Sequence, residues 1–86
     1  MFYVYILKST KDGNLYIGYT NDLKKRFEAH NKGKVFSTVK RRPLLLVYYE
    51  AFKAQRDATT REQQIKQFKS AYGHLKKRIA LSMHEA

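Results

Sequence analysis

Two short runs of β-branched and aromatic residues near the start of the chain constrain its fold most strongly. Residues 3–7 (Tyr-Val-Tyr-Ile-Leu) and 15–19 (Leu-Tyr-Ile-Gly-Tyr) have the composition of β-strands, and an Asp-Gly-Asn segment between them favours a turn. The pattern predicts a β-hairpin. A turn centred near residues 10 and 11 would set Tyr5 opposite Tyr16, with both phenol groups on one face.

This tyrosine pair does not by itself distinguish packing from chemistry. Tyrosine is a favourable strand residue, and aromatic pairs across neighbouring strands are common packing devices. Spacing alone therefore favours a structural role, and a functional role needs support from later residues.

Length and composition limit the class of protein. The chain has 86 residues, which suffice for one compact domain with a single modest core and not for two. It has no cysteine, which excludes a disulfide framework and a thiolate zinc site. The N-terminal apolar run is too short for a membrane span and lacks the flanks of an export signal. We therefore expect one domain over residues 1–86, in the cytoplasm, monomeric, without a membrane anchor or a small-molecule cofactor.

The charge balance is strongly basic. Eighteen Lys and Arg residues against seven Asp and Glu residues give a formal net charge of +11. Such an excess is usually compensated by a polyanionic partner whose counterions are released on binding, so nucleic acid is the leading candidate. A solubilising or ribosome-adherent surface without a dedicated site is the alternative. An acidic membrane is disfavoured because no segment combines a basic face with a broad apolar one.

Residues 23–31 are predicted to form the first helix, since capping residue types precede them and a glycine follows. Leu23 and Phe27 define the buried stripe at helical spacing, and Arg26 and His30 flank or join that face. Each has an ordinary structural interpretation. An arginine there can extend its stem along apolar surface, and a lone histidine at an apolar border is usually a hydrogen-bonded core residue.

The predicted loop over residues 32–43 concentrates three cations, Lys40, Arg41 and Arg42. Most such triplets are only solvated. Beside an active site, however, this one would be well placed to contact phosphates.

A continuous apolar run at residues 44–49 predicts a third strand. Because a helix joins strands two and three, the third strand can lie beyond strand one and parallel to strand two through a right-handed crossover. This arrangement gives a sheet of order 2-1-3 with Tyr5 in the central strand.

Two more helices are predicted, at residues 55–71 and 74–84, with Gly73 ending the first of them. The expected fold class is α/β: a small antiparallel or mixed three-stranded sheet flanked by three helices.

Glu62 lies on the rim of the apolar stripe of the second helix, and Arg61 lies equally near that stripe. A solvated glutamate paired with Lys66 four residues later is a live alternative to any functional role. A hard divalent cation, however, needs oxygen ligands, and Glu62 is the only carboxylate between Asp57 and Glu85.

Residues 3–5 (Tyr-Val-Tyr) and 16–18 (Tyr-Ile-Gly) resemble the two signature tripeptides of the GIY-YIG endonuclease superfamily, and the interval between them is also similar. The second tripeptide matches letter for letter. The first has Tyr3 in place of glycine, as in the small stand-alone bacterial branch. The spacing from Tyr16 to Arg26 and His30 resembles that superfamily as well.

The resemblance extends over almost the whole chain and implies a fold, an activity and a site. It implies a metal-dependent endonuclease that hydrolyses phosphodiester bonds in nucleic acid, in particular DNA, with a role in DNA repair or processing. Tyr5 would deprotonate the attacking water, Arg26 would hold the scissile phosphate, and Glu62 would bind a single Mg²⁺ or Mn²⁺. By the same resemblance, Tyr16 and His30 would orient or assist, and the products would carry a 5′-phosphate and a 3′-hydroxyl.

Two other classes remain open from the residues. Several larger relatives have an asparagine after the metal-binding glutamate, and this chain has none beyond Asn31. A nucleic-acid-binding module without useful catalysis is therefore the first alternative. The second treats the two helices around Gly73 as a helix-turn-helix, but a lone glycine is a weak turn signal.

Overall fold

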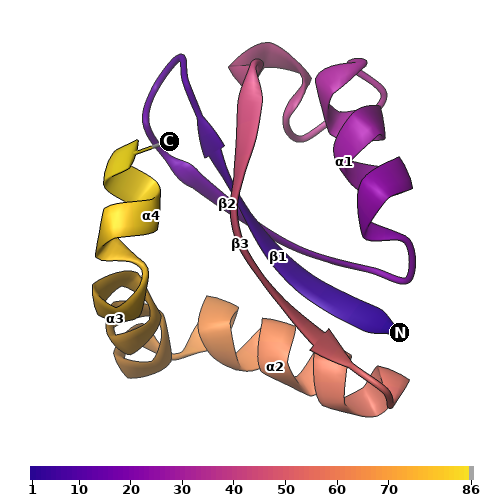
Figure 1. The fold of residues 1–86 in the computed structure, drawn as a ribbon, viewed down its shortest axis with the longest axis vertical. Coiled ribbons are helices and arrows are strands. Elements are labelled where there is room, and N and C mark those ends of the chain that lie inside the picture. The colour runs from indigo at the N-terminus through magenta and orange to yellow at the C-terminus, as the bar shows by residue number, and fades with distance from the viewer. Residues whose placement is uncertain (86) are drawn as a thin grey trace.

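The computed structural model describes residues 1–85, which form one three-stranded sheet with helices on both faces (Figure 1). The α1 helix lies on one side of the sheet, and α2 to α4 lie on the other. The predicted α/β class is confirmed. The elements are β1 (Phe2–Ser9), β2 (Leu15–Thr20), α1 (Leu23–Asn31), the 3-10 helix η1 (Val39–Arg41), β3 (Leu44–Phe52), α2 (Gln55–Gln67), α3 (Lys69–Arg78) and α4 (Ala80–Glu85).

The sheet has the predicted order, β2-β1-β3. The central strand β1 pairs antiparallel with both neighbours, so β3 runs in the same direction as β2, as the crossover rule indicated. Asn31 fixes the end of the crossover: its amide donates to the Leu44 carbonyl at 2.9 Å and accepts from the Leu44 N–H at 2.8 Å. The last residue of α1 is thereby tied to the first residue of β3.

The predicted register of the hairpin is wrong by two residues. Tyr5 lies opposite Gly18, and Tyr16 lies opposite Leu7. The turn is longer than expected because Gly13, at a φ of 74°, closes it through an N–H bond to the Ser9 carbonyl. A shift of two residues keeps every side chain on its original face, so Tyr5 and Tyr16 still share one side of the sheet.

The two faces of β1 form two separate cores. Val4 and Ile6 pack under α2, α3 and α4, while Tyr5 and Leu7 pack under α1. Opposite Ile6 and Leu7, β3 has one extra residue, because Tyr48 and Leu46 are their respective partners. This irregularity lets Leu46 and Tyr49 both face α1.

The predicted helices over 55–71 and 74–84 are wrong in their boundaries, and residues 1–85 contain four α-helices rather than three. The first predicted helix ends at Phe68, whose backbone is extended (φ −109°, ψ 114°), and Gly73 lies inside α3. The second break falls at Ile79 (φ −111°, ψ 21°). These breaks change the direction of the chain (Figure 1), and Leu75 and Ile79 pack with Ile65 in the core.

Within residues 1–85, no helix combines the length and apolar character needed to cross a membrane.

Candidate active site

Tyr5 lies at the centre of the α1 side of the sheet and is fully buried. Its ring passes over Gly18 of the neighbouring strand. A β-carbon at Gly18 would lie 2.8 Å from Tyr5 Cε1, and closer still to Cζ and the hydroxyl oxygen. Glycine is therefore required at position 18 because any side chain would displace the tyrosine.

His30, in the last turn of α1, connects Tyr5 to the loop that follows the helix. Its Nε2 lies 2.8 Å from the Tyr5 hydroxyl and its Nδ1 lies 2.8 Å from Thr38 Oγ1. All three residues are buried. Burial, together with the positive charge of Arg26, lowers the pKa of His30 to about 4. The imidazole is therefore neutral at neutral pH.

Arg26, one turn before His30, approaches the same hydroxyl. Its Nε donates to the Tyr5 oxygen at 3.4 Å. Burial raises the pKa of Tyr5 above its ordinary value, and the hydrogen bond from Arg26 only partly offsets this. The positive charge of Arg26 lowers the pKa of Tyr5, as a tyrosine that acts as a base requires, but burial raises that pKa by more.

One assignment of protons satisfies every partner in this cluster. The Tyr5 oxygen accepts from Arg26 Nε, its own hydrogen points to His30 Nε2, and His30 Nδ1–H donates to Thr38 Oγ1. Tyr5 then has a neutral acceptor already in contact with its proton.

Tyr16 completes the group from β2. Its ring centroid lies 5.1 Å from that of His30 and 6.4 Å from that of Tyr5. The structure thus brings together four of the five predicted catalytic residues. We name these four residues and Thr38 together the Tyr5 cluster: Tyr5, Tyr16, Arg26, His30 and Thr38.

Glu62 lies apart from the hydrogen bonds of the cluster. It extends from α2, its side chain is 20% exposed, and its Oε2 lies 3.1 Å from Lys66 Nζ. The predicted alternative, an ion pair with Lys66, is thus present in the structure. Its negative charge is still close enough to contribute to the raised pKa of Tyr5.

Glu62 offers a metal ion a single carboxylate. Residues 1–85 contain no group of three or more His, Asp or Glu side chains that could enclose an ion. Mg²⁺ does not require such a cage, because it commonly binds one or two carboxylates and completes its shell with water and substrate phosphate. A partly exposed single carboxylate fits that mode of binding.

The three predicted phosphate-binding cations are not equivalent. Arg41 is used internally: its Nε lies 3.3 Å from Asp12 Oδ2 and its Nη2 donates to the Leu15 carbonyl at 3.4 Å. Lys40 and Arg42 are exposed, and although Arg42 Nε donates to the Val39 carbonyl at 2.9 Å, neither residue has an acidic partner within residues 1–85. These two side chains, rather than the triplet, remain available to a phosphate backbone.

Two polar contacts, one in the Tyr5 cluster and one across the sheet from it, were not predicted. Thr38, inside the predicted loop, orients His30, and no periodic pattern marks a loop residue of this kind. Arg61 forms a bidentate contact with Glu50, with Nε 3.1 Å from each carboxylate oxygen. Helical spacing puts Arg61 near the apolar stripe, but its partner Glu50 on β3 follows only from the arrangement of the sheet.

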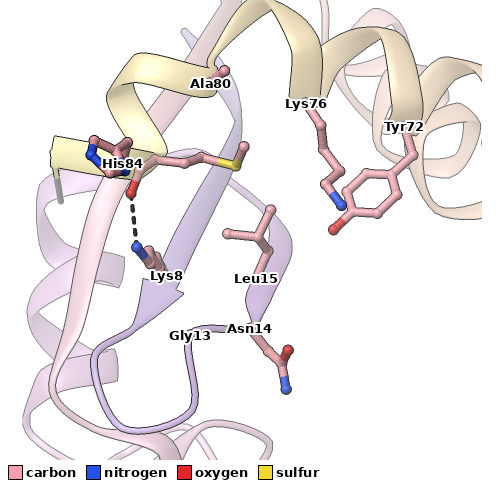
Figure 2. A pocket seen from close by; sticks show the side chains of 9 residues that line it. Lys8, Gly13, Asn14, Leu15, Tyr72, Lys76, Ala80 and His84 are labelled. Atoms are coloured by element: carbon pink, nitrogen blue, oxygen red, sulfur yellow. Dashed lines mark hydrogen bonds between the residues drawn. The ribbon is translucent and has the colours of Figure 1, made fainter.

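A different cleft, of about 380 Å³, lies on the other side of the sheet between the hairpin turn and α3 and α4 (Figure 2). Its cations have intramolecular partners. Lys8 Nζ donates to the Met83 carbonyl at 2.8 Å, and Lys76 Nζ lies 5.1 Å from the centroid of the Tyr72 ring. No predicted site residue lines this cleft.

Comparison with known proteins places the chain among proteins with the same signature. The family model described as the GIY-YIG catalytic domain matches residues 1–78. The chain is 52% identical over 67 residues to a UPF0213 protein of Clostridium perfringens, covering 77% of this chain and 71% of that protein. It is 48% identical over 67 residues to a UPF0213 protein of Staphylococcus saprophyticus, covering 77% and 80%.

A solved structure is similar as well. The solution NMR structure of a UPF0213 protein from Bacillus halodurans superimposes with a TM-score of 0.55 at 37% sequence identity. The match covers 87% of this chain and 82% of that one.

Proposed function

The chain belongs to the GIY-YIG family, a superfamily of nuclease domains, and from this premise we propose that it is an endonuclease that hydrolyses phosphodiester bonds in DNA with the help of a divalent cation. The observation that carries the proposal is the Tyr5 hydroxyl, which is buried between a cationic donor, Arg26, and a neutral acceptor, His30. Packing alone accounts for hydrogen-bond partners at a buried phenol, but not for a cationic partner that has no carboxylate to neutralise it within residues 1–85. We further propose a single monomeric domain over residues 1–86 that acts in DNA repair or processing.

Hydrolysis joins a water oxygen to phosphorus and breaks the bond to the 3′ oxygen. The products are a 5′-phosphate and a 3′-hydroxyl. Tyr5, once ionised, would take a proton from the attacking water. Its own proton has an acceptor 2.8 Å away in His30 Nε2, and Thr38 fixes the orientation of that ring. Tyr16 packs against both rings and holds their geometry.

Arg26 would bind the scissile phosphate. Its Nε is directed to Tyr5, and a guanidinium has further N–H groups that can donate to phosphate oxygens. An arginine that contacts both the base and the phosphate would keep the attacking water and the phosphorus close together. It would also stabilise the negative charge that develops on the phosphoryl oxygens.

Glu62 extends from α2, across the sheet from α1, but its charge still acts on Tyr5, and from there it would hold Mg²⁺ or Mn²⁺. When bound, such a cation supplies positive charge to the leaving 3′ oxygen. The Lys66 ammonium, 3.1 Å from the carboxylate, neutralises Glu62 in the structure. Glu62→Gln removes the anionic oxygen and preserves size and helix propensity, so it should abolish metal-dependent cleavage without unfolding the protein.

A nucleic-acid-binding module without catalysis is the second candidate. The ion pair between Glu62 and Lys66 favours it, because this is the contact expected of a glutamate with no metal to bind. The charge of +11 fits both candidates equally.

The two candidates separate in a cleavage assay. Purified protein is incubated with single-stranded, duplex, flapped and branched DNA and RNA, with and without Mg²⁺ or Mn²⁺. We expect metal-dependent nicking of at least one DNA structure, reduced by at least about a hundredfold in Tyr5→Phe. Binding without cleavage by the wild type would favour the second candidate, and full cleavage by Tyr5→Phe would return Tyr5 to a packing role.

A further inference from the structure

A cleft of about 510 Å³ opens beside the Tyr5 cluster, on the same side of the sheet. It lies between the first turns of α1 and strands β1 and β3. Its walls are aromatic and aliphatic, and the residues at the start of α1 add polar groups. The side chains used in the argument are Tyr3, Asn21, Lys24, Phe27, Leu46 and Tyr49.

Tyr49 is the unusual member of this set. It is 52% exposed, although it lies in a strand of the sheet. Tyr3 contacts it edge to face, with ring centroids 6.0 Å apart and an angle of 64° between the planes. The contact holds the exposed ring in a defined position. A positioned and exposed aromatic ring is the surface on which nucleobases stack.

The cleft lies next to the proposed reaction centre along β1, although the two share no lining residue and Arg26 borders a separate hollow. Tyr49 is the direct partner of Tyr5 in the β1–β3 ladder, and Tyr3 precedes Tyr5 by two residues on the same face. Two residues of a strand span roughly 7 Å, which is on the order of one nucleotide of an extended strand. Phe27, in the wall, directly follows Arg26 in α1. A base roughly one or two nucleotides away from a phosphate held by Arg26 is therefore within reach of the cleft.

Two of the polar residues at the rim suit the same occupant, and the third, the Asp22 carboxylate, accepts from the Lys25 N–H at 3.1 Å. Asn21 can donate to and accept from the edge of a base, and Lys24 can contact the adjoining phosphate. From these observations we infer that the cleft binds one unpaired base of the substrate strand, an inference that rests on the proposed function. A base inside a duplex is stacked on both faces and cannot enter, so the preferred substrate carries an unpaired or extruded nucleotide next to the scissile phosphate.

The test uses two DNA duplexes that differ only in one unpaired 2-aminopurine, with EDTA present so that the DNA stays intact. Anisotropy gives the affinity, and quenching of 2-aminopurine fluorescence reports stacking. Tyr49→Ala should weaken binding to the duplex with the unpaired base by about tenfold or more and abolish the quenching. Affinity for the fully paired duplex should change by less than about twofold. Tyr49→Trp should retain both affinity and quenching.

The matched control is Phe68→Ala, which removes an aromatic side chain of similar exposure, 56%, at the junction of α2 and α3. It should leave affinity for both duplexes unchanged. Equal losses on the two duplexes in Tyr49→Ala, or no loss on either, would overturn the inference, as would a wild type that binds neither. Equally tight binding of free adenosine 5′-monophosphate would also overturn it by identifying a free nucleotide as the occupant.

The outcome separates this inference from the proposed function. If Tyr49→Ala selectively weakens binding while the wild type cleaves none of the DNA or RNA structures, the base-binding cleft is supported and the nuclease activity is refuted. If cleavage depends on Tyr5 but Tyr49→Ala has no selective effect on binding, the nuclease activity is supported and the base-binding cleft is refuted.

Discussion

Two arginines, Arg26 and Arg61, extend from helices on opposite sides of the same sheet toward hydroxyl and carboxyl groups of its strands. Arg61 meets a carboxylate: its Nε lies 3.1 Å from both oxygens of Glu50, and its Nη2 lies 3.0 Å from one of them. Arg26 meets a phenol, the Tyr5 hydroxyl at 3.4 Å. Within residues 1–85, no carboxylate forms an ion pair with Arg26.

The difference distinguishes a cation that is neutralised inside the protein from one that can still bind an anion. The charge of Arg61 is neutralised by Glu50, which also accepts a hydrogen bond from Tyr48 at 2.6 Å. An anion would gain little there. The charge of Arg26 is not neutralised by its neutral partner, so a phosphate can still compensate it. The α1 side is therefore the side where the protein retains an unused cation next to an ionisable hydroxyl.

We expect the largest difference between the two arginines in DNA cleavage, when each is replaced by glutamine. Arg26→Gln should lower kcat/KM for the DNA nicked by the wild type by about a hundredfold to a thousandfold, because it removes charge stabilisation at the phosphate. Arg61→Gln, corrected for the folded fraction, should stay within about threefold of wild type. Equal losses in both variants would remove the distinction between the two sides.

The pH dependence of stability should separate the two sides next. The pKa of His30 is lowered to about 4, below its unfolded value near 6.5, so its contribution to stability is present above pH 6.5. It is lost as pH falls from 6.5 to 4 and amounts to at most about 3 kcal/mol. Denaturant unfolding across this range should show the loss in the wild type and a flatter profile in His30→Gln.

Glu50 should affect the stability of the protein at a lower pH than His30 does. Burial acts to raise the pKa of Glu50, but hydrogen bonds from Arg61 and Tyr48 bring it below its ordinary value of 4.5. Its contribution is thus present above pH 4.5 and lost below. Glu50→Gln should flatten only that part of the profile, and an unchanged loss between pH 6.5 and 4 in His30→Gln would contradict the assignment.

The fold could be predicted largely because its signals are local or topological. Apolar runs marked the three strands, and the helix between strands two and three allowed the order with β1 in the centre. The register failed because it depends on the turn, where Gly13 closes a longer loop than the Asp-Gly-Asn segment suggests. The break at Phe68 arises from tertiary packing of α3 and carries no proline or glycine signal.

The site was predictable only where a motif carried it. Tyr5, Tyr16, Arg26 and His30 converge as their resemblance to the family implies. Tyr49 lies outside any such motif, and the hydrogen bond between Thr38 and His30 could be found only from the fold. Periodicity placed Arg61 and Glu62 equally near the apolar stripe, and the structure pairs Arg61 with the Glu50 carboxylate on β3 and Glu62 with Lys66.

Thermal and denaturant unfolding should show the reverse ranking of the two arginines. Arg61→Gln leaves Glu50 buried without its cation, and because both side chains keep some exposure (24% and 20%), we expect a loss of about 1–2 kcal/mol. Arg26→Gln should cost less than about 0.5 kcal/mol or be neutral, since it removes an unpaired charge. If Arg26→Gln destabilises the protein more than Arg61→Gln does, the Tyr5 cluster serves the stability of the fold.

The smallest effects should come from the basic loop. Lys40→Ala and Arg42→Ala should each flatten the slope of log K against log salt for DNA binding by roughly 0.7–0.9 if each contacts one phosphate. Arg41→Ala should leave the slope unchanged, because Arg41 is paired with Asp12. A change in slope confined to Arg41→Ala would reverse this assignment.

The most direct test of the central claim observes the two guanidinium groups themselves. The Nε–H resonances of Arg26 and Arg61 are assigned by NMR with the two glutamine variants and followed while a short, uncleaved DNA strand is added in EDTA. We predict that the Arg26 resonance shifts in a saturable manner and that the Arg61 resonance stays in place. A saturable shift of Arg61 with an unmoved Arg26 would contradict the claim that the α1 side binds the phosphate.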